Sequence, residues 1–488
     1  MSPGRDEQQP LLSNSESYSH GQNDTHKQKV DFEEDDPENP QNWPVYWKYA
    51  VVFQVSMIAF FLPLTSSMYA PVADNIGTEY GADDQIVLLN QSGYVCMLGI
   101  GPLLWAPMSE TFGRRTIYLL GLVIFTLIQI PIALAPDIET FVIFRTLSGF
   151  FGSVGVGNGG GSISDMFGSR DRSKAVGFYM IWPLLAPTIG PLIGGIMVDH
   201  VNWHYLSWFN LVTSGILLVA CYFFLHETRA ITILQHKKHE LEKEDSGTEY
   251  YIKGDSQKSF TFKVTGNATR ALKILFTQPI VLTMSIYQAL IFSTMYSLYA
   301  QYTSIWTKPP YQFTKTEVGF AYLGPAIGFV LTSIIVILSI DKVYDWAAKR
   351  NDSDGQPEYR LPLANVGALL LPVSLFWFGW TVEKGLHWSI PLIGTVLFGA
   401  SQVGIFNTVQ TYYIDAYASN AASALAAGSF LRSIVGAIVP LFVGKMFDKL
   451  GYGWGMSVFG AIAVLLMPAP LLFYWFGKRL RESYPFEG

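Results

Sequence analysis

The chain has 488 residues, of which 50% are hydrophobic and only 14% are charged. Soluble domains carry roughly 25% charged residues, so this composition excludes an ordinary soluble protein. The net charge of −6 leaves no basic surface for nucleic acid and predicts no nucleic-acid partner.

Long apolar runs follow one another along almost the whole chain. About 20 apolar residues cross a bilayer of about 30 Å, and a soluble core hides at most a few such helices. We predict an all-α integral membrane protein with twelve transmembrane helices. The predicted spans are 48–71, 87–108, 116–135, 139–164, 173–197, 206–226, 279–303, 317–340, 361–381, 388–414, 421–445 and 454–476.

The positions of Lys and Arg orient these spans, because cytoplasmic loops collect basic residues. With the N-terminus inside, the first three outer loops contain no Lys or Arg. We therefore predict that both termini are cytoplasmic. The basic residues predicted to be cytoplasmic include Arg114, Arg115, Arg170, Arg172, Lys174, Lys342, Lys349, Arg350, Arg360, Lys478, Arg479 and Arg481.

The segment before the first span, residues 1–44, carries ten acidic and three basic residues. Such a composition predicts a disordered acidic cytoplasmic tail. The rest of the chain is then close to neutral, so the acidic pI says nothing about the charge of a substrate. No basic region with a cleavage site precedes the first span, and we expect no removable signal peptide.

The spans divide six and six around a polar linker at residues 229–277, which is too long for a helical hairpin turn. We predict an N-terminal bundle at 45–228, a C-terminal bundle at 278–477 and a short cytoplasmic tail at 478–488. Two such halves indicate a central site that opens alternately to either side when one half rocks on the other.

The two cysteines, Cys96 and Cys221, both fall in predicted spans. We expect small buried hydrophobes there rather than a disulfide or a metal pair, and we expect neither cofactor nor metal. The chain has no phosphate-binding loop and no constellation of nucleophile and base, so neither an ATP-driven pump nor an enzyme is expected.

A polar string joins the second and third spans, and it predicts a conformational gate. Gly113 permits a tight reversal with positive φ, and Arg114 and Arg115 follow in the headgroup region. We expect Glu110 to lie against the N-terminus of the eleventh helix, where an anion is stabilised. Asp165, at the end of the fourth span, is the expected partner of either arginine, in a pair that latches the halves together on the cytoplasmic side. The alternative for the arginines is an ordinary positive-inside turn.

The fifth span contains Gly190-Pro191-Leu192-Ile193-Gly194-Gly195. The proline removes one backbone donor and wedges the preceding turn. Glycines four residues apart allow a neighbouring helix to approach to backbone contact. We therefore predict that this motif is a pivot against a partner helix.

These strings resemble motifs of the major facilitator superfamily. The string 106–115 resembles the loop motif Gly-x-Leu-Ala-Asp-Arg-x-Gly-Arg-Arg, with Ala106, Glu110 and Thr111 departing from it. Gly190–Gly195 resembles the Gly-Pro-x-x-Gly-Gly motif of proton-coupled drug antiporters, and Arg145–Gly149 resembles their intramembrane arginine motif. Further strings resemble the fungal twelve-helix drug:proton antiporter branch: Asn39-Pro-Gln-Asn42-Trp43, Tyr412–Tyr417, Leu431-Arg432-Ser433 and Pro440-Leu441-Phe442.

The resemblance covers about residues 39–482 and implies efflux of small organic molecules, usually against protons. Drugs, toxins, polyamines, organic acids and secondary metabolites are the common substrates of such proteins. Antiporters of this sort often carry an acid in the first helix, where this chain has Gln54 and Thr65. Coupling would then use Asp165, Glu110 or the surroundings of Arg145, and facilitated export without protons remains the alternative.

Arg145 and Arg432 are the strong charges predicted deep in the bilayer. An arginine at a helix centre costs about 2.5 kcal/mol or more, so such residues usually face a cavity and serve function. We assign both to coupling or substrate binding. No Asp or Glu lies comparably deep in the first, second, fifth, seventh, eighth or eleventh span, which favours neutral or anionic substrates over polyamines and other cations.

Polar and aromatic residues share helical faces in several spans, as in a cavity for flat amphipathic ligands. Helix packing is the alternative for each of them. The candidate lining residues are Gln54, Tyr94, Gln288, Tyr299, Asn407 and Gln410.

We predict a monomeric exporter of a small organic compound, most simply by proton antiport, in the plasma membrane or alternatively the vacuolar membrane. A nutrient importer of the same fold is the first competitor, but the seventh span lacks the paired glutamines typical of sugar porters. A receptor that signals without transport is the second. Only about a dozen residues follow the last span, which disfavours a signalling tail.

Overall fold

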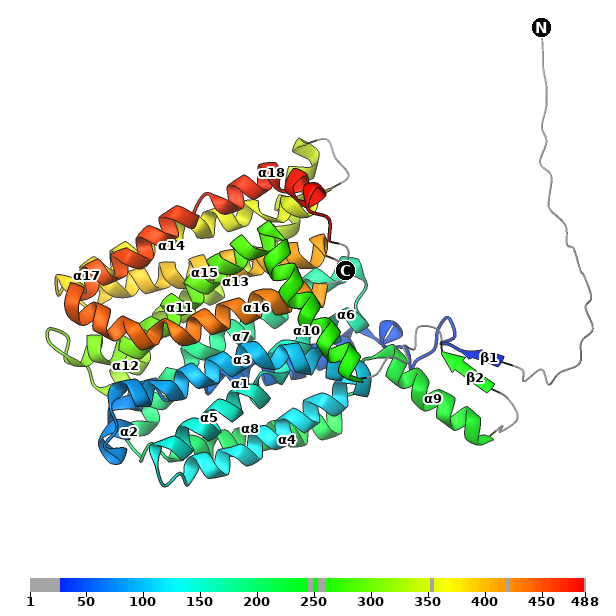
Figure 1. Cartoon of the computed structure of the whole chain (residues 1–488), viewed down its shortest axis with the longest axis horizontal. Helices are drawn as coiled ribbons and strands as arrows, with labels where there is room; N and C mark the ends of the chain where they lie inside the picture. Colours follow the sequence, from blue (N-terminus) through cyan, green and yellow to red (C-terminus); the bar gives the residue numbers. More distant parts are fainter. Residues whose placement is uncertain (1–26, 245–248, 253–259, 352–354, 418–420, 487–488) are drawn as a thin grey trace, which may run out of the picture.

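The computed structural model describes residues 27–244, 249–252, 260–351, 355–417 and 421–486. Its described part is a bundle of long helices with a small unit at one end, which is the cytoplasmic end in the predicted orientation (Figure 1). In the view of Figure 1, helices of the N-terminal half lie below those of the C-terminal half.

The N-terminal half contains six membrane-crossing segments, one of them made of two consecutive helices. Its elements are η1 (Pro40–Asn42), α1 (Val45–Leu64), η2 (Ala70–Val72), α2 (Ala73–Tyr80), α3 (Asp84–Phe112), α4 (Arg114–Ala133), α5 (Ile138–Gly152), α6 (Val154–Met166), α7 (Ser169–Val198) and α8 (Tyr205–Phe224).

The C-terminal half also contains six membrane-crossing segments, and more of them are made of consecutive helices. Its elements are α11 (Pro279–Thr307), α12 (Lys315–Ala321), α13 (Leu323–Arg350), η3 (Pro357–Arg360), α14 (Pro362–Glu383), α15 (Ser389–Ala416), α16 (Ala421–Ile438), α17 (Pro440–Leu466) and α18 (Ala469–Ser483).

Within the described residues, eleven helical stretches are long and apolar enough to cross a membrane, and Ser423–Ile438 is a shorter apolar helix beside them. One of the eleven, Pro440–Ser483, contains a break at Gly451, whose φ is +73°. Residues 421–450 and 452–483 therefore form the eleventh and twelfth spans. The predicted all-α membrane fold is confirmed.

Two sharp turns use a glycine with positive φ, followed at once by a helix. Gly113 has φ +91°, as expected from the sequence. After it, Glu227 accepts hydrogen bonds from the backbone N–H groups of Arg114 and Arg115 at 2.9 and 3.1 Å. After Gly451, Glu383 accepts in the same way from Tyr452 and Gly453. In each case a carboxylate from another element caps the new helix, whose first N–H groups have no partner within the helix.

The N-terminal segment is not a free tail from Lys27 onward, and the predicted disorder of residues 1–44 is wrong for that part. Strand β1 (Lys27–Val30) pairs in parallel with β2 (Glu249–Ile252) of the linker. Val30 packs with Leu234 of α9 (Ala230–Glu244) and with the β2 residues Tyr250 and Ile252. Net charge alone misses this pairing, because a few apolar residues suffice to bury the strand against the linker. Residues 1–26 lie outside the described part.

An ion pair adds to this cytoplasmic unit. The Asp36 carboxylate lies 3.0 Å from the Lys237 ammonium on α9. The backbone N–H of Glu38 and the Lys237 side chain together hold the pKa of Asp36 below its ordinary value. The acidic segment therefore uses part of its charge to dock on the linker.

The linker also contains α10 (Phe260–Thr277), which lies across the cytoplasmic end of the bundle (Figure 1). This helix packs against α3 of one half and against α16 and α11 of the other. Ala271, Ile274 and Leu275 are buried there. The linker is thus a helical element that touches both halves.

The glycine motif of α7 brings helices into backbone contact, as predicted. A Cβ on Gly190 would lie 2.4 Å from the Leu64 carbonyl oxygen, and one on Gly194 would lie 2.1 Å from that of Met68. A Cβ on Gly195 would lie 2.5 Å from the carbonyl oxygen of Lys315, in the opposite half. Helix α7 therefore packs on both halves without a side chain between the backbones.

Gly194→Ala should destabilise the bundle, because its new methyl group meets a backbone carbonyl that cannot rotate away. We expect a loss of about 1–3 kcal/mol in the free energy of unfolding, as for other overpacked interiors. The matched control is Gly215→Ala in α8, where the nearest atom is 4.0 Å away. Thermal unfolding of both purified variants in detergent measures the difference, and equal midpoints would contradict the packing argument.

Candidate substrate cavity and conformational sites

A cavity of about 300 Å³ lies between the two halves. Its wall begins in the middle of the bundle, at residues such as Pro63 and Tyr296. It extends to Ser164 near the end of α6 and to Arg172 in the first turn of α7, which are cytoplasmic ends in the predicted orientation. The cavity is therefore directed toward the cytoplasm.

The cavity combines aromatic walls with positive charge. Arg432 of α16 and Arg172 are its charged lining residues, and none of the described residues that line it is acidic. The Arg432 guanidinium lies 5.5 Å from the ring centroid of Phe292 and 5.3 Å from that of Phe406, within the range of cation–π attraction. Its Nε has no hydrogen-bond partner among the described residues.

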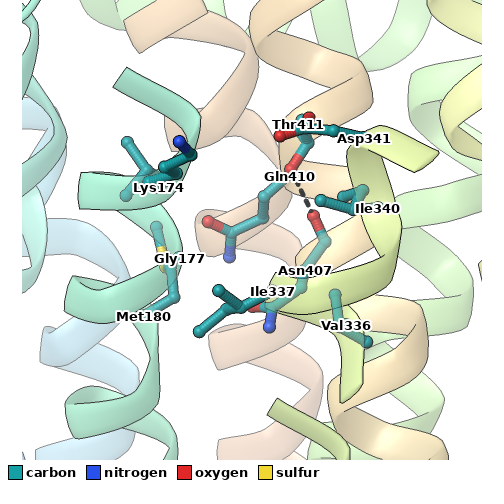
Figure 2. Close-up of a pocket in the computed structure, with 11 residues that line it drawn as sticks. Lys174, Gly177, Met180, Val336, Ile337, Ile340, Asp341, Asn407, Gln410 and Thr411 are labelled. Carbon is teal, nitrogen blue, oxygen red and sulfur yellow. Dashed lines mark hydrogen bonds between the residues drawn. The ribbon is translucent and has the colours of Figure 1, made fainter. Parts of the chain in front are cut away.

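Two of the six predicted lining residues lie at cavities, and the other four line neither of them. Gln410 lines the central cavity and also a second, smaller one, where Asn407 lies as well (Figure 2). Tyr94 instead donates to the Leu62 carbonyl at 2.6 Å, and the Tyr299 hydroxyl lies 2.9 Å from that of Thr188. The other two residues that line neither cavity are Gln54 and Gln288.

Arg145 is fully buried between α5 and α1, and it does not line the central cavity. Its Nη2 donates to the Thr65 carbonyl at 2.7 Å, at the end of α1. The guanidinium lies 4.4 Å from the ring centroid of Tyr69 and 4.8 Å from that of Tyr94. Its Nε and Nη1 have no partner among the described residues. Arg145 thus stabilises the C-terminal end of α1, which lies inside the membrane.

At the cytoplasmic turn, Arg114 Nε lies 3.1 Å from Asp165 Oδ2, and the Arg114 side chain is 7% exposed. The arginine also contacts the Ser109 hydroxyl. Arg115 donates from Nη2 to the Tyr222 carbonyl at 2.7 Å. The expected partnership of Asp165 with one of the two arginines is present.

The expected latch between the halves is nevertheless wrong in this conformation, because both partners belong to the N-terminal bundle. Arg114 begins α4 and Asp165 ends α6, so their pair ties α4 to α6. Glu110 interacts electrostatically with Arg114 and with Arg229. Burial and the nearby positive charge of Arg114 lower the pKa of Arg229. The expected contact of Glu110 with the start of the eleventh helix stays a prediction.

The halves also make polar contacts with each other at the opposite end, which is the outer end in the predicted orientation. The Asp199 carboxylate, which follows α7, accepts from the Thr316 backbone N–H at 2.8 Å and from its hydroxyl at 2.5 Å. The neighbouring Lys315 donates to Asn75. Together with the close approach at Gly195, these contacts close the outer side. Sequence reasoning missed Asp199 and Thr316, although Thr314 and Glu317 form a capping box that marks this helix start.

The C-terminal half has its own cytoplasmic charge cluster. Arg360 of η3 lies 2.9 Å from both Asp341 and Asp415 and so ties α13 to α15. Sequence reasoning missed the joining role of Arg360, because its partners come from two other segments.

A family model described as Major Facilitator Superfamily matches residues 55–440 of this chain. The chain is 36% identical over 467 residues to "Uncharacterized transporter mfc1" of Schizosaccharomyces pombe, covering 92% of this chain and 94% of that protein. It is 34% identical to "Efflux pump radE" of Floropilus chiversii (93% and 84% covered) and 35% identical to "Efflux pump FUBT" of Fusarium oxysporum (93% and 76% covered).

Solved structures share the fold at low sequence identity. The proton:xylose symporter XylE aligns with a TM-score of 0.66 at 14% identity, over 91% of this chain and 100% of that one. The human organic anion transporter MFSD10 aligns with a TM-score of 0.59 at 15% identity, over 88% and 100%. These likenesses concern the fold alone.

Asp165→Asn should destabilise the N-terminal bundle, because it removes the carboxylate that pairs directly with the buried Arg114. We expect a loss of about 3 kcal/mol in the free energy of unfolding. The control is Glu242→Gln, which breaks an exposed pair with Lys238 and should cost less than about 0.5 kcal/mol. Thermal unfolding in detergent compares the two, with Asp165→Glu as a variant that keeps the charge. Equal midpoints for Asp165→Asn and Glu242→Gln would refute the structural role of the pair.

Proposed function

The chain belongs to the major facilitator superfamily and is a multi-pass membrane transporter, and we propose that it exports neutral or anionic small organic molecules by alternating access. The substrate enters the central cavity from the cytoplasm while the outer side is closed. Rocking of the halves then opens the outer side and releases the substrate.

The observation that carries the proposal is Arg432 in a cavity without acidic lining residues. Its guanidinium faces two phenylalanine rings and has an unpartnered Nε, so an anionic or electron-rich planar ligand gains both charge attraction and stacking there. A polyamine would meet two arginines and no carboxylate among the described lining residues. The charge of the cavity therefore supports anions and neutral aromatic molecules over cations.

One further observation supports export over nutrient uptake. Relatives over nine-tenths of this chain carry the names "Efflux pump radE" and "Efflux pump FUBT". We place the exporter in the plasma membrane, as a monomer, with the vacuolar membrane as the alternative.

Proton antiport is the proposed energy source, with facilitated export as its alternative. The motifs at Arg145 and Gly190–Gly195 resemble those of proton-coupled antiporters, which favours coupling. Since none of the described lining residues is acidic, proton and substrate would not share a carboxylate there. Acids near the cytoplasmic turn, namely Asp165 and Glu110, are the proposed protonation sites.

Arg432→Gln should weaken binding of an anionic dye. We expect the Kd for fluorescein to rise roughly tenfold or more, since one charge-assisted contact is lost. Arg350→Gln, outside the cavity, should leave the Kd unchanged. Dye binding to purified protein in nanodiscs measures both. Wild-type protein that prefers the cationic dye rhodamine 123 to fluorescein would refute the charge argument.

A pH gradient should drive transport in reconstituted vesicles if protons are exchanged for substrate. We expect fluorescein to accumulate against its gradient when protons flow the other way, and a protonophore should abolish this accumulation. Dye movement that only equilibrates, at the same rate with or without the gradient, would establish facilitated export instead.

A further inference from the structure

A second cavity, of about 20 Å³, lies beside the central one (Figure 2). It is enclosed by α7 of the N-terminal half and by α13 and α15 of the C-terminal half. Val176, Met180 and Gln410 line both cavities, so the two spaces adjoin. A ligand in the central cavity therefore has a neighbouring space into which one of its ends can reach.

The second cavity contains a buried amide donor that lacks a partner in a largely apolar setting. Asn407 is 7% exposed, and its Nδ2 has no hydrogen-bond partner among the described residues. Gln410 is 8% exposed, and its carboxamide extends toward Gly177 and Met180 of α7 (Figure 2). Much of the remaining wall is aliphatic, as at Ile337. A buried amide donor without a partner costs free energy, which an acceptor oxygen from a ligand would recover.

Helix α15 links this donor pair to the central cavity. Phe406 and Gln410 are four residues apart, so they lie one above the other on the same helix face. Phe406 lines the central cavity, Gln410 lies at the boundary, and Asn407 lines the second cavity. Helix α15 thus places an aromatic ring at the central cavity, one amide at the boundary and one amide at the second cavity.

The charged groups at the rim of the second cavity balance one another. Lys174 and Asp341 both line it. Asp341 shares Arg360 with Asp415, each at 2.9 Å, and no ion pair joins Lys174 to a described residue. Two positive and two negative charges cancel, so the amides, and not the rim charge, select the end group.

We propose that Asn407 and Gln410 form a second substrate subsite, which binds the carboxylate or carbonyl oxygen at one end of an extended substrate. The planar part of the same substrate lies in the central cavity against Phe406 and Arg432. This inference rests on the proposed export function and narrows its substrate class to molecules with a planar body and a separate acceptor group.

The subsite also lies where the two halves meet. A Cβ on Gly177 of α7 would lie 3.2 Å from Cγ1 of Ile337 on α13, so the halves touch at this cavity. A ligand that contacts both walls binds only when they are at this distance. Its affinity therefore differs between the inward-facing and outward-facing conformations, as transport by alternating access requires.

Two matched dyes test the subsite. Fluorescein carries a carboxylate apart from its anionic xanthene body, and 6-hydroxy-9-phenyl-3H-xanthen-3-one has the same body without the carboxylate. We expect Asn407→Leu to raise the Kd for fluorescein roughly tenfold and to leave the Kd for the second dye unchanged. Gln410→Leu should weaken fluorescein more than the second dye, because Gln410 lines both cavities. Asn407→Asp covers the case in which Asn407→Leu does not fold, and it should also weaken fluorescein selectively through charge repulsion.

The control variant is Asn365→Leu on α14, a partly buried amide that also lacks a partner at Oδ1 but lines neither cavity. Its Kd for both dyes should match the wild type. Equal losses for both dyes in the Asn407 variants, or no loss for fluorescein, would overturn the subsite while leaving the export proposal intact. Wild-type protein that binds neither dye would overturn both.

Discussion

The backbone contact of α7 with α1 and with the start of α12 sets the shape of the molecule. Gly190 and Gly194 remove the side chains that would separate α7 from the end of α1, and Gly195 does the same against Lys315 of the other half. Since hydrophobic burial does not distinguish helix contacts from lipid contacts, such close packing is a main source of association within a bilayer. The outer end closes there, and the space left between the halves lies on the cytoplasmic side.

Some polar groups pair with one another within the protein, whereas others lie at a cavity wall with an atom that has no partner in the described part. Arg114 with Asp165 and Arg360 with Asp341 and Asp415 are satisfied clusters at helix ends, which hold each bundle together. Arg432 and Asn407 have unpartnered nitrogen atoms at the walls of cavities. Because an unpartnered polar group within the membrane is costly, its retention points to a ligand, and a transporter whose site empties in every cycle requires such groups.

The linker and the N-terminal segment form a third part of the molecule. Strand pairing of β1 with β2 and the contact of Asp36 with Lys237 attach the acidic segment to α9. Helix α10 touches both halves at the cytoplasmic end. The linker therefore lies where the halves must separate or approach during alternating access, although its polar composition suggested only a connection.

The sequence by itself determined the membrane spans, the glycine contact at α7 and the positive φ of Gly113. Each follows from a local property, namely hydropathy over about 20 residues or the absence of a Cβ. Only the tertiary structure decided which partner each polar residue meets. Helical periodicity places Tyr94, Asn407 and Arg145 on a face, but the packing of twelve helices determines whether that face meets a backbone carbonyl, a neighbouring ring or a cavity. The sequence also paired Asp165 with the arginines inside the predicted bundle at 45–228, but only the structure shows that the pair ties α4 to α6.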